Sequence, residues 1–337
     1  MLSRILLCVQ FTISYVGVKA VENCPVTHKN LTYLRYGTWS RISTTAKSTP
    51  PCFKKVELGF RCGVPSHPSH GTALPQVFTP HGCALKPFDG EAFVFTMKSR
   101  TLWLFGDSLT RTFYQQLLCS LEPSGVHVIS RRGFRYVAGK RFEKVRCHVY
   151  TYNVAVCFVM AKPDTLTYAL KMIENRVSRN DVVLANFGLW YITRKSFSRH
   201  VQTTAGWLSR MRRKHNITTI WREVTPSFFA VNGKEDTFDL QFNPLIRESL
   251  STRNKFSCVR PKNMIKKNWR NSVGNKIMED SYVTILPVWD ISSSEGAFKH
   301  VVQVNPEKNK VDCTHYCVIP HGVVETWVDL FLNFFVR

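Results

Sequence analysis

Two segments far apart in the chain carry the residue types that acyl-transfer chemistry needs. GDSLTR at 106–111 follows an apolar run, and DCTHYC at 312–317 lies near the C-terminus. A serine hydroxyl becomes a nucleophile when an imidazole accepts its proton, and a nearby carboxylate can hold the imidazole in the required tautomer. Ser108, His315 and Asp312 therefore form a candidate nucleophile, base and orienter. Two plainer interpretations stay open: Ser108 or Asp107 only caps the following helix, or the Asp-x-x-His spacing arises by chance.

A third polar residue ends another apolar run. Asn186 follows the hydrophobic stretch that begins at 181, and its side-chain amide could donate a hydrogen bond to an oxyanion. The alternative is an asparagine that only forms a turn.

The elements that would position these residues alternate along the chain. Short apolar runs predict strands at 101–105, 126–129, within 145–160, and at 181–187, 218–224 and 282–288. Amphipathic stretches predict helices at 110–121, 165–177, 197–215, 243–252, 263–278 and 323–335. This alternation predicts an α/β fold with a mostly parallel sheet covered on both faces. Since reactive groups gather at the carboxyl ends of such strands, Ser108 and Asn186 should share one sheet edge.

The N-terminus and the cysteines indicate the secretory pathway. Residues 1–20 have the basic, apolar and small-residue parts of a signal peptide, with a short signal anchor as the alternative. Asn30 and Asn216 lie in glycosylation sequons. Ten cysteines follow the signal, an even number that predicts disulfides: Cys24, Cys52, Cys62, Cys83, Cys119, Cys147, Cys157, Cys258, Cys313 and Cys317. No Cys/His cluster has the spacing of a zinc site, so we expect no metal.

The formal net charge is +23. Such a charge often indicates nucleic-acid binding. The predicted signal peptide and the lack of any nucleic-acid-binding motif in the sequence argue against that function. We therefore expect no nucleic-acid partner. The basic residues either form a solvated cationic surface or attract an acidic glycan or an anionic membrane surface.

Six motifs in order resemble the SGNH/GDSL hydrolase superfamily, its PC-esterase branch, and within it the trichome-birefringence-like polysaccharide O-acetyltransferases. The resemblance covers about 52–335 and rests on GFRC at 59–62, HGCALKPFDG at 81–90, GDSLTR, Tyr152-Asn153, Asn186 with Trp190-Tyr191, and DCTHYC followed by VETW at 324–327. The chain departs from these relatives at 225–228, where TPSF replaces a motif that carries histidine, and around 292–300, so the acceptor sugar stays open.

The resemblance implies an SGNH-like three-layer sandwich at 96–337 behind a disulfide-rich, loop-dominated lobe at 21–95. It implies Ser108 as nucleophile, His315 as base, Asp312 as orienter and Asn186 as oxyanion donor. A backbone glycine should complete the oxyanion hole, with Gly133 preferred and Gly139 open. Arg111 and Trp190 would hold substrate or have structural roles. Cys313 and Cys317 should be disulfide-bonded.

The implied activity is a double displacement through an acetyl-serine, with a glycan or polysaccharide as acceptor. No cofactor would be bound permanently. Acetyl-CoA or another acetyl carrier would be the co-substrate. A membrane-bound donor system is a possible partner that would supply it. The Golgi lumen is the expected location, with secretion as the alternative. Two further functions stay open: an acetylesterase with the same three residues, and a catalytically silent glycan-binding protein.

Overall fold

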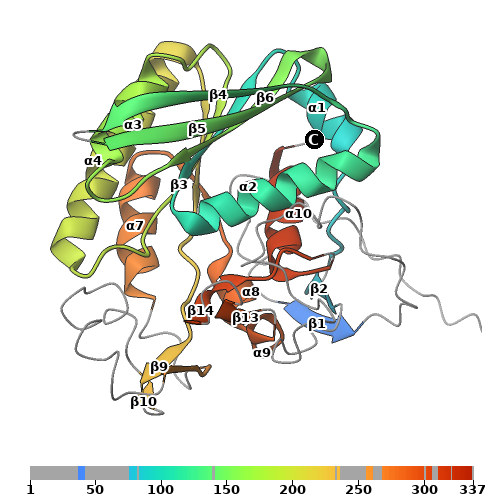
Figure 1. The fold of residues 1–337 in the computed structure, drawn as a ribbon, viewed down its shortest axis with the longest axis vertical. Helices are drawn as coiled ribbons and strands as arrows, with labels where there is room; N and C mark the ends of the chain where they lie inside the picture. The colour runs from blue at the N-terminus through green and yellow to red at the C-terminus, as the bar shows by residue number, and fades with distance from the viewer. Residues whose placement is uncertain are drawn as a thin grey trace, which may run out of the picture.

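The structure, a computed structural model, describes residues 37–41, 76–81, 83–138, 141–231, 234–235, 256–260, 268–299, 301–305, 310–319 and 321–335. The signal segment, most of the predicted N-terminal lobe and the helix predicted at 243–252 lie outside these residues, so those predictions remain predictions. Figure 1 shows a three-layer arrangement in which a central sheet lies between two groups of helices.

Within the described residues, seven strands form the central sheet in the spatial order β12-β8-β7-β3-β6-β5-β4. Their bounds are β3 Thr101–Gly106, β4 Val128–Ala138, β5 Arg141–Tyr150, β6 Val154–Met160, β7 Val182–Asn186, β8 Thr218–Arg222 and β12 Thr284–Leu286. The pairs from β12 to β6 are parallel, whereas β5 and β4 add an antiparallel hairpin at one edge. The predicted mostly parallel α/β fold is confirmed.

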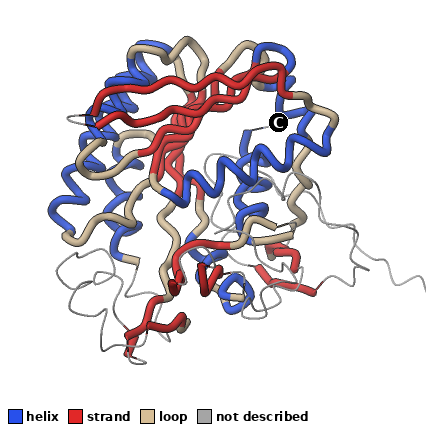
Figure 2. The backbone as a smooth tube through the Cα atoms, in the orientation of Figure 1, coloured by secondary structure: helices blue, strands red, loops and turns tan. Residues whose placement is uncertain are grey.

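Helices cover both faces of the sheet because its central strands are apolar on both sides. In β3, Leu102 and Leu104 belong to one hydrophobic cluster, while Trp103 and Phe105 belong to the other. The first cluster is covered by α1 (Gly90–Thr96), α2 (Ser108–Leu121) and α10 (Val323–Phe335), and the second by α3 (Leu166–Glu174), α4 (Arg194–His215) and α7 (Trp269–Asp280). Figure 2 shows the strands stacked between these helices.

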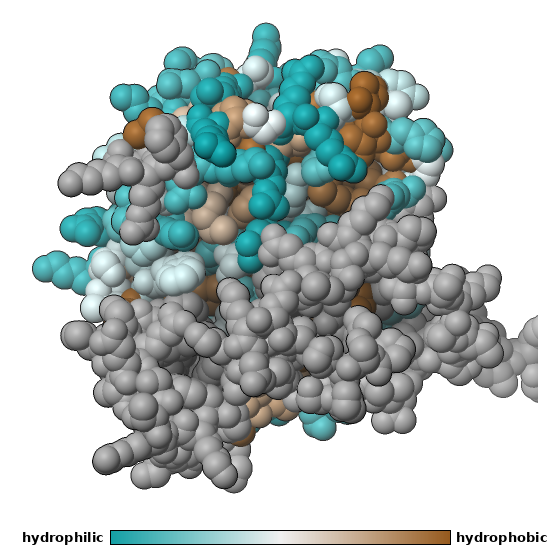
Figure 3. All heavy atoms as spheres, viewed as in Figure 1, coloured by the Kyte–Doolittle hydropathy of each residue, from teal (hydrophilic) through white to brown (hydrophobic). Residues whose placement is uncertain are grey.

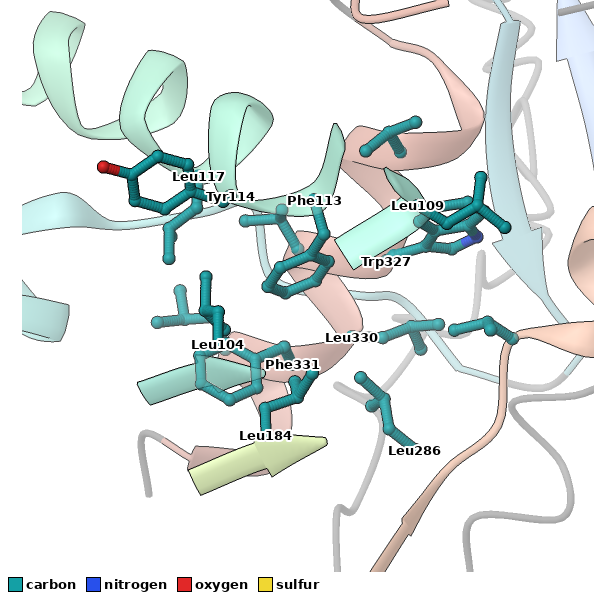
Figure 4. Close-up of a cluster of buried hydrophobic side chains, with 14 of the residues drawn as sticks. Leu104, Leu109, Phe113, Tyr114, Leu117, Leu184, Leu286, Trp327, Leu330 and Phe331 are labelled. Carbon is teal, nitrogen blue, oxygen red and sulfur yellow. The ribbon is translucent and has the colours of Figure 1, made fainter. Parts of the chain in front are cut away.

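The two helices beside the candidate site share one apolar core. Phe113 of α2 and Phe331 of α10 meet edge to face at 5.8 Å, in the same cluster as Leu104 and Leu184 of the sheet (Figure 4). Trp327 of α10 is fully buried in the same cluster. The C-terminal helix predicted at 323–335 is thus a wall of the core on which the start of α2 rests.

Several smaller elements complete the described structure. They are β1 (Gly37–Arg41), β2 (Gln76–Pro80), η4 (Glu122–Ser124), η5 (Thr151–Asn153), β9 (Phe229–Val231), β10 (Lys234–Glu235), β11 (Phe256–Cys258), α8 (Trp289–Ser293), α9 (Glu295–Phe298), β13 (Val301–Asn305) and β14 (Lys310–Tyr316). The antiparallel pair β13–β14 carries the Asp-x-x-His segment, where the sequence analysis predicted no strand. Polar residues interrupt this segment, so it lacks the apolar run from which the other strands were predicted.

Disulfides connect strands in the central sheet and beside the Asp-x-x-His segment. Cys147 pairs with Cys157 across β5 and β6, and Cys258 pairs with Cys313 across β11 and β14. Cys83 and Cys317 are also disulfide-bonded. Such bonds fit an oxidising, lumenal or extracellular compartment.

Cys119, in contrast, is a buried thiol on α2, so its assignment to a disulfide was wrong. An even count of cysteines does not require every sulfur to pair. Cys24, Cys52 and Cys62 lie outside the described residues. Among the residues that are described, no helix is both long and apolar enough to cross a bilayer.

Gly106 ends β3 where two strands approach closely. A Cβ added there would lie 1.9 Å from the carbonyl oxygen of Asn186 on β7 and 2.2 Å from Oγ1 of Thr110 on α2. Only glycine fits this position, which fixes the turn that leads into Ser108.

We therefore expect Gly106→Ala to separate β3 from β7 and to lower the unfolding free energy by about 1–3 kcal/mol through overpacking. Gly206→Ala is the matched control, because a Cβ at this exposed position of α4 meets nothing within 4 Å. Thermal unfolding of both variants measures the effect. Equal melting temperatures for the two variants would contradict the packing argument.

Candidate active site

At the junction of β3 and α2, one residue caps the helix and the next is the candidate nucleophile. Asp107 is the N-cap of α2, and its Oδ1 accepts a hydrogen bond from the Leu109 N–H at 3.0 Å. Ser108 is the first helical residue and is half-buried. Since Asp107 caps the helix, the hydroxyl of Ser108 is left for another contact.

That contact is His315, 207 positions away in the chain. Its Nε2 lies 2.8 Å from Ser108 Oγ, and its Nδ1 lies 2.8 Å from Asp312 Oδ2. Because a carboxylate only accepts, Nδ1 carries the proton toward Asp312, and Nε2 is then the acceptor for the serine proton. Figure 1 shows β14, which carries both residues, beside the start of α2. The structure brings the three predicted residues together in the expected order.

An irregularity in the β13–β14 pair lets Asp312 and His315 face each other. Residues three apart in a regular strand point to opposite faces. Here Val301 pairs with Tyr316 but Gln303 pairs with Asp312, so three residues of β14 oppose one residue of β13. Such a bulge re-aims side chains. Asp312 Oδ1 also accepts the His315 N–H at 3.1 Å, which closes a local turn around the carboxylate.

The charge state of Asp312 suits an orienter. Burial alone would raise its pKa. The attraction and hydrogen bonds of His315, together with the Thr314 N–H, outweigh that effect and hold the pKa below its usual value. The carboxylate is therefore ionised at neutral pH and stabilises the imidazolium that forms when Nε2 takes a proton.

Several bonds hold the β14 segment in place. The Cys258–Cys313 disulfide ties it to β11, and the carbonyl of Cys313 accepts the Phe228 N–H at 2.8 Å. The hydroxyls of Ser227 and Thr314 lie 2.8 Å apart. These anchors lie one and two residues before His315, so the imidazole is presented by a fixed backbone.

Asn186 ends β7 at the expected sheet edge, but its amide N–H groups are bonded to carbonyls at the end of β8 and just after it. It is fully buried, and its Nδ2 donates to the carbonyls of Arg222 at 2.8 Å and Glu223 at 3.1 Å. An amide has two N–H donors, and both are engaged here. In this arrangement Asn186 links β7 to β8, and an oxyanion role would require one of these bonds to break.

The sequence interpretation missed a buried charged group next to this asparagine. Arg222 ends β8, is fully buried, and donates from Nη2 to Asn186 Oδ1 at 2.6 Å. Its guanidinium lies 4.8 Å from the ring centroid of Trp327. Burial lowers the pKa of Arg222 to about 10, while the charge of Asp107 works in the opposite direction. Arg222 is therefore a cation inside the core beneath the nucleophile.

Asp107 is the acidic counterpart of Arg222. Burial raises its pKa, and Arg222 with the N–H groups of Leu189, Leu109 and Gly188 partly offsets the shift. Oδ2 of Asp107 accepts from the N–H groups of Gly188 and Leu189, at 3.2 and 3.4 Å. Asp107 thus joins the β3–α2 junction to the loop after β7.

Glu223, the next residue after Arg222, completes the buried charges. It is fully buried and accepts the N–H groups of Val288 at 3.0 Å and Trp289 at 2.9 Å. The signal in the sequence was an Arg-Glu pair at the end of an apolar strand, where charges are costly unless paired.

Gly133 does not reach the site. It pairs with Arg146 in the β4–β5 hairpin, and Arg146 is level with Phe158 on β6 and Leu104 on β3. Three strand spacings put it about 14 Å from β3. Its N–H is too far from Ser108 for an oxyanion hole, so its predicted role fails on position. Gly139 lies outside the described residues.

The remaining predicted residues have mixed positions. Arg111 lies one turn after Ser108 on α2 and is half-buried. Trp190 is 41% exposed, in a loop that Arg270 holds by donating to the carbonyls of Gly188 and Tyr191. Asn216 is the exposed C-cap of α4, whereas Asn30 lies outside the described residues. In the described part of the chain, no group of three or more His, Cys, Asp or Glu side chains is arranged to hold a metal ion.

Comparisons with known proteins agree with this geometry. The chain is similar to "Protein trichome birefringence-like 4" of Arabidopsis thaliana, with 23% identity over 185 residues, which cover 48% of this chain and 39% of the relative. The chain thus spans well under half the length of that relative. The model of the PC-Esterase family, described as a GDSL/SGNH-like acyl-esterase family found in Pmr5 and Cas1p, matches residues 85–334. That match contains all three site residues and most of the chain. The chain therefore belongs to the PC-Esterase family of GDSL/SGNH-like proteins.

Proposed function

We propose that this protein is a glycan O-acetyltransferase that works through an acetyl-Ser108 intermediate. The observation that carries the proposal is the chain of two 2.8 Å contacts from Asp312 through His315 to Ser108. This arrangement suits covalent acyl transfer, in which one difficult displacement becomes two easier ones.

In the first half-reaction, His315 Nε2 takes the proton of Ser108 as Oγ attacks the acetyl carbonyl carbon. The tetrahedral intermediate collapses when the bond to the donor's leaving group breaks, and the leaving group takes the proton from His315. The enzyme then carries an acetyl ester on Ser108, and the imidazole is neutral again.

In the second half-reaction, a sugar hydroxyl gives its proton to His315 Nε2 while its oxygen attacks the acetyl carbon. The bond to Ser108 Oγ breaks, and the serine recovers its proton from His315. Attack by water instead of the sugar would release acetate. The second candidate function is therefore acetylester hydrolysis, which the family description as acyl-esterases favours.

The oxyanion of both intermediates would lie at the N-terminus of α2. Backbone N–H groups of the first turn and the positive end of a helix favour a developing negative charge. Leu109 N–H already serves Asp107, so we assign the donor role first to the Ser108 N–H. The predicted Asn186 donor remains a second possibility that needs a rearranged amide.

The setting of the reaction follows from the secretory features of the chain. We propose the Golgi lumen as location, with secretion as the alternative. The acceptor is a glycan or polysaccharide, and the donor is acetyl-CoA or another acetyl carrier, delivered in one variant by a membrane-bound partner. The disulfides support an oxidising compartment.

The nucleophile is tested by mass spectrometry of the protein after exposure to an acetyl donor. We expect a peptide acetylated on Ser108, with transfer to an added oligosaccharide and little free acetate. Ser108→Ala should abolish the adduct and all turnover, whereas Ser120→Ala on the same helix should not. Acetate release that an oligosaccharide does not divert would identify an esterase. Full activity of Ser108→Ala would exclude both functions.

The orienting role of Asp312 is tested with Asp312→Asn. The amide can no longer stabilise an imidazolium and can favour the wrong tautomer, so we expect turnover of a small acetyl ester to fall by about 10⁴-fold with the fold intact. Asp280→Asn, at an exposed carboxylate that pairs with Lys276 on α7, is the control. Steady-state kinetics and circular dichroism measure both effects. A loss below about tenfold in kcat would show that Asp312 does not orient the base.

A further inference from the structure

A cavity lies beside α2, the helix that carries the nucleophile. It has a volume of about 400 Å³ and lies between α2 and the β4–β5 hairpin. Tyr114, Gln115 and Leu118 form its helical wall, and residues of both hairpin strands form the other. No part of the proposed reaction uses it.

The cavity opens on the same side of α2 as the catalytic serine. Residues spaced by three and four positions share one face of a helix, and Ser108, Arg111, Gln115, Leu118 and Glu122 have this spacing. At 1.5 Å per residue, Gln115 lies about 10 Å along the helix from Ser108. A chain molecule lying along this face would reach both places.

The hairpin wall is strongly basic. Arg131 pairs with His148, and Arg146 two residues away on β5 pairs with Gly133, so these side chains share one face of the hairpin. Arg131 and Arg146 are both exposed and both line the cavity. Gly133, the partner of Arg146 on β4, adds no side chain to this face.

The basic face continues toward the catalytic edge. Arg135 pairs with Lys144 farther along the same face, and both are exposed. The neighbour of Lys144, Val145, is level with Val159 of β6 and Phe105 of β3, so Lys144 is level with the end of β3. Figure 3 shows hydrophilic side chains over the upper part of this face, where Figure 1 places the hairpin.

The interior of the cavity presents hydrogen-bond donors. The hydroxyl of Tyr114 lies 2.6 Å from Nδ1 of His148. Burial, and then the charges of Arg131 and Arg146, lower the pKa of His148 to about 4, so the ring is neutral. Burial raises the pKa of Tyr114, so the phenol keeps its proton and can donate it to Nδ1. Nε2 of His148 then carries the remaining proton.

Two lining groups accept hydrogen bonds. Glu122 is the one carboxylate among the described residues that line the cavity, whereas two arginines line it. Gln115 also lines the cavity, and its buried Oε1 atom has no hydrogen-bond partner in the described structure, so rotation of this side chain into the cavity would offer an acceptor to a sugar hydroxyl. Donors and cations outnumber acceptors, which matches a ligand that is both hydroxylated and anionic.

We propose that this cavity is a subsite for an acidic sugar, and hence that the acceptor is an anionic glycan. The guanidinium groups of Arg131 and Arg146 hold a carboxylate or sulfate, while a neighbouring sugar along α2 presents its hydroxyl to Ser108. Guanidinium groups recognise such planar or multidentate anions through paired hydrogen bonds. The inference rests on the proposed function, since it names the substrate class of that reaction.

Phosphate groups of a nucleotide-type acetyl donor have related chemistry, so the test separates the two sources. Calorimetric titrations of the full mature chain use three probes: an oligogalacturonate, a neutral xylo-oligosaccharide and coenzyme A. The double variant Arg131→Gln/Arg146→Gln is compared with Arg132→Gln. Arg132 is an exposed neighbour on β4 whose side chain points to the opposite face.

We expect the double variant to bind oligogalacturonate at least about tenfold more weakly, because each charge-assisted bond is strong. Arg132→Gln should bind it as the wild type does. Wild-type binding should also weaken with added salt. The neutral oligosaccharide should bind equally to all three proteins, which shows that the variants are folded.

Two results would overturn the inference: unchanged oligogalacturonate binding in the double variant, or a loss confined to coenzyme A, which would assign the cavity to the donor. The proposed function is tested separately by Ser108-dependent turnover of a small acetyl ester in the wild type. Arginine-dependent binding of the acidic sugar without that turnover would retain the subsite and reject the acetyltransferase. Ser108-dependent turnover together with binding that does not depend on the two arginines would retain the proposed function and reject the subsite.

Discussion

The carboxylate of Asp107 is fully buried, and the bonds that compensate for its burial come from separate parts of the chain. The N–H of Leu109 comes from the first turn of α2, and those of Gly188 and Leu189 come from the loop after β7. Arg222 supplies an opposite charge from the end of β8. Because an uncompensated buried charge costs several kcal/mol, these segments are held in one arrangement. Ser108 is the residue next to this carboxylate, and its position is a consequence of that arrangement.

The other half of the site comes from β14, which is separate from the parallel sheet. Bringing the two segments together over 207 positions costs chain entropy, which the packing of α10 on α2 and the Cys258–Cys313 disulfide offset. The bulge in β14 then turns Asp312 and His315 to one side. The nucleophile is thus fixed by a buried polar network, and the base by a cross-linked strand. The 2.8 Å contact between His315 and Ser108 depends on both.

Residue type and spacing predicted the sheet and offered the three site residues as candidates, and the family resemblance then assigned their roles. Apolar runs at 101–105 and 181–187 that alternate with amphipathic stretches are typical of a parallel sheet buried on both faces. Acyl transfer needs a nucleophile, a base and an orienter of particular types. The oxyanion roles predicted for Asn186 and Gly133 do not match the structure, because the positions and contacts of these residues depend on partners far away in the sequence. Nothing local to Asn186 indicates that the carbonyls of Arg222 and Glu223 would engage its amide. Nothing local to Gly133 reveals that it faces Arg146 in a long hairpin.

The central claim is that the imidazole of His315 activates the hydroxyl of Ser108. The most direct measurement is the rate at which a fluorophosphonate, a reagent for activated serines, labels the protein. The account predicts labelling on Ser108, a fall of about 10²–10⁴-fold in His315→Ala, and no change in His200→Ala, whose imidazole contacts Tyr191. Labelling at another serine, or an equal rate in His315→Ala, would contradict it.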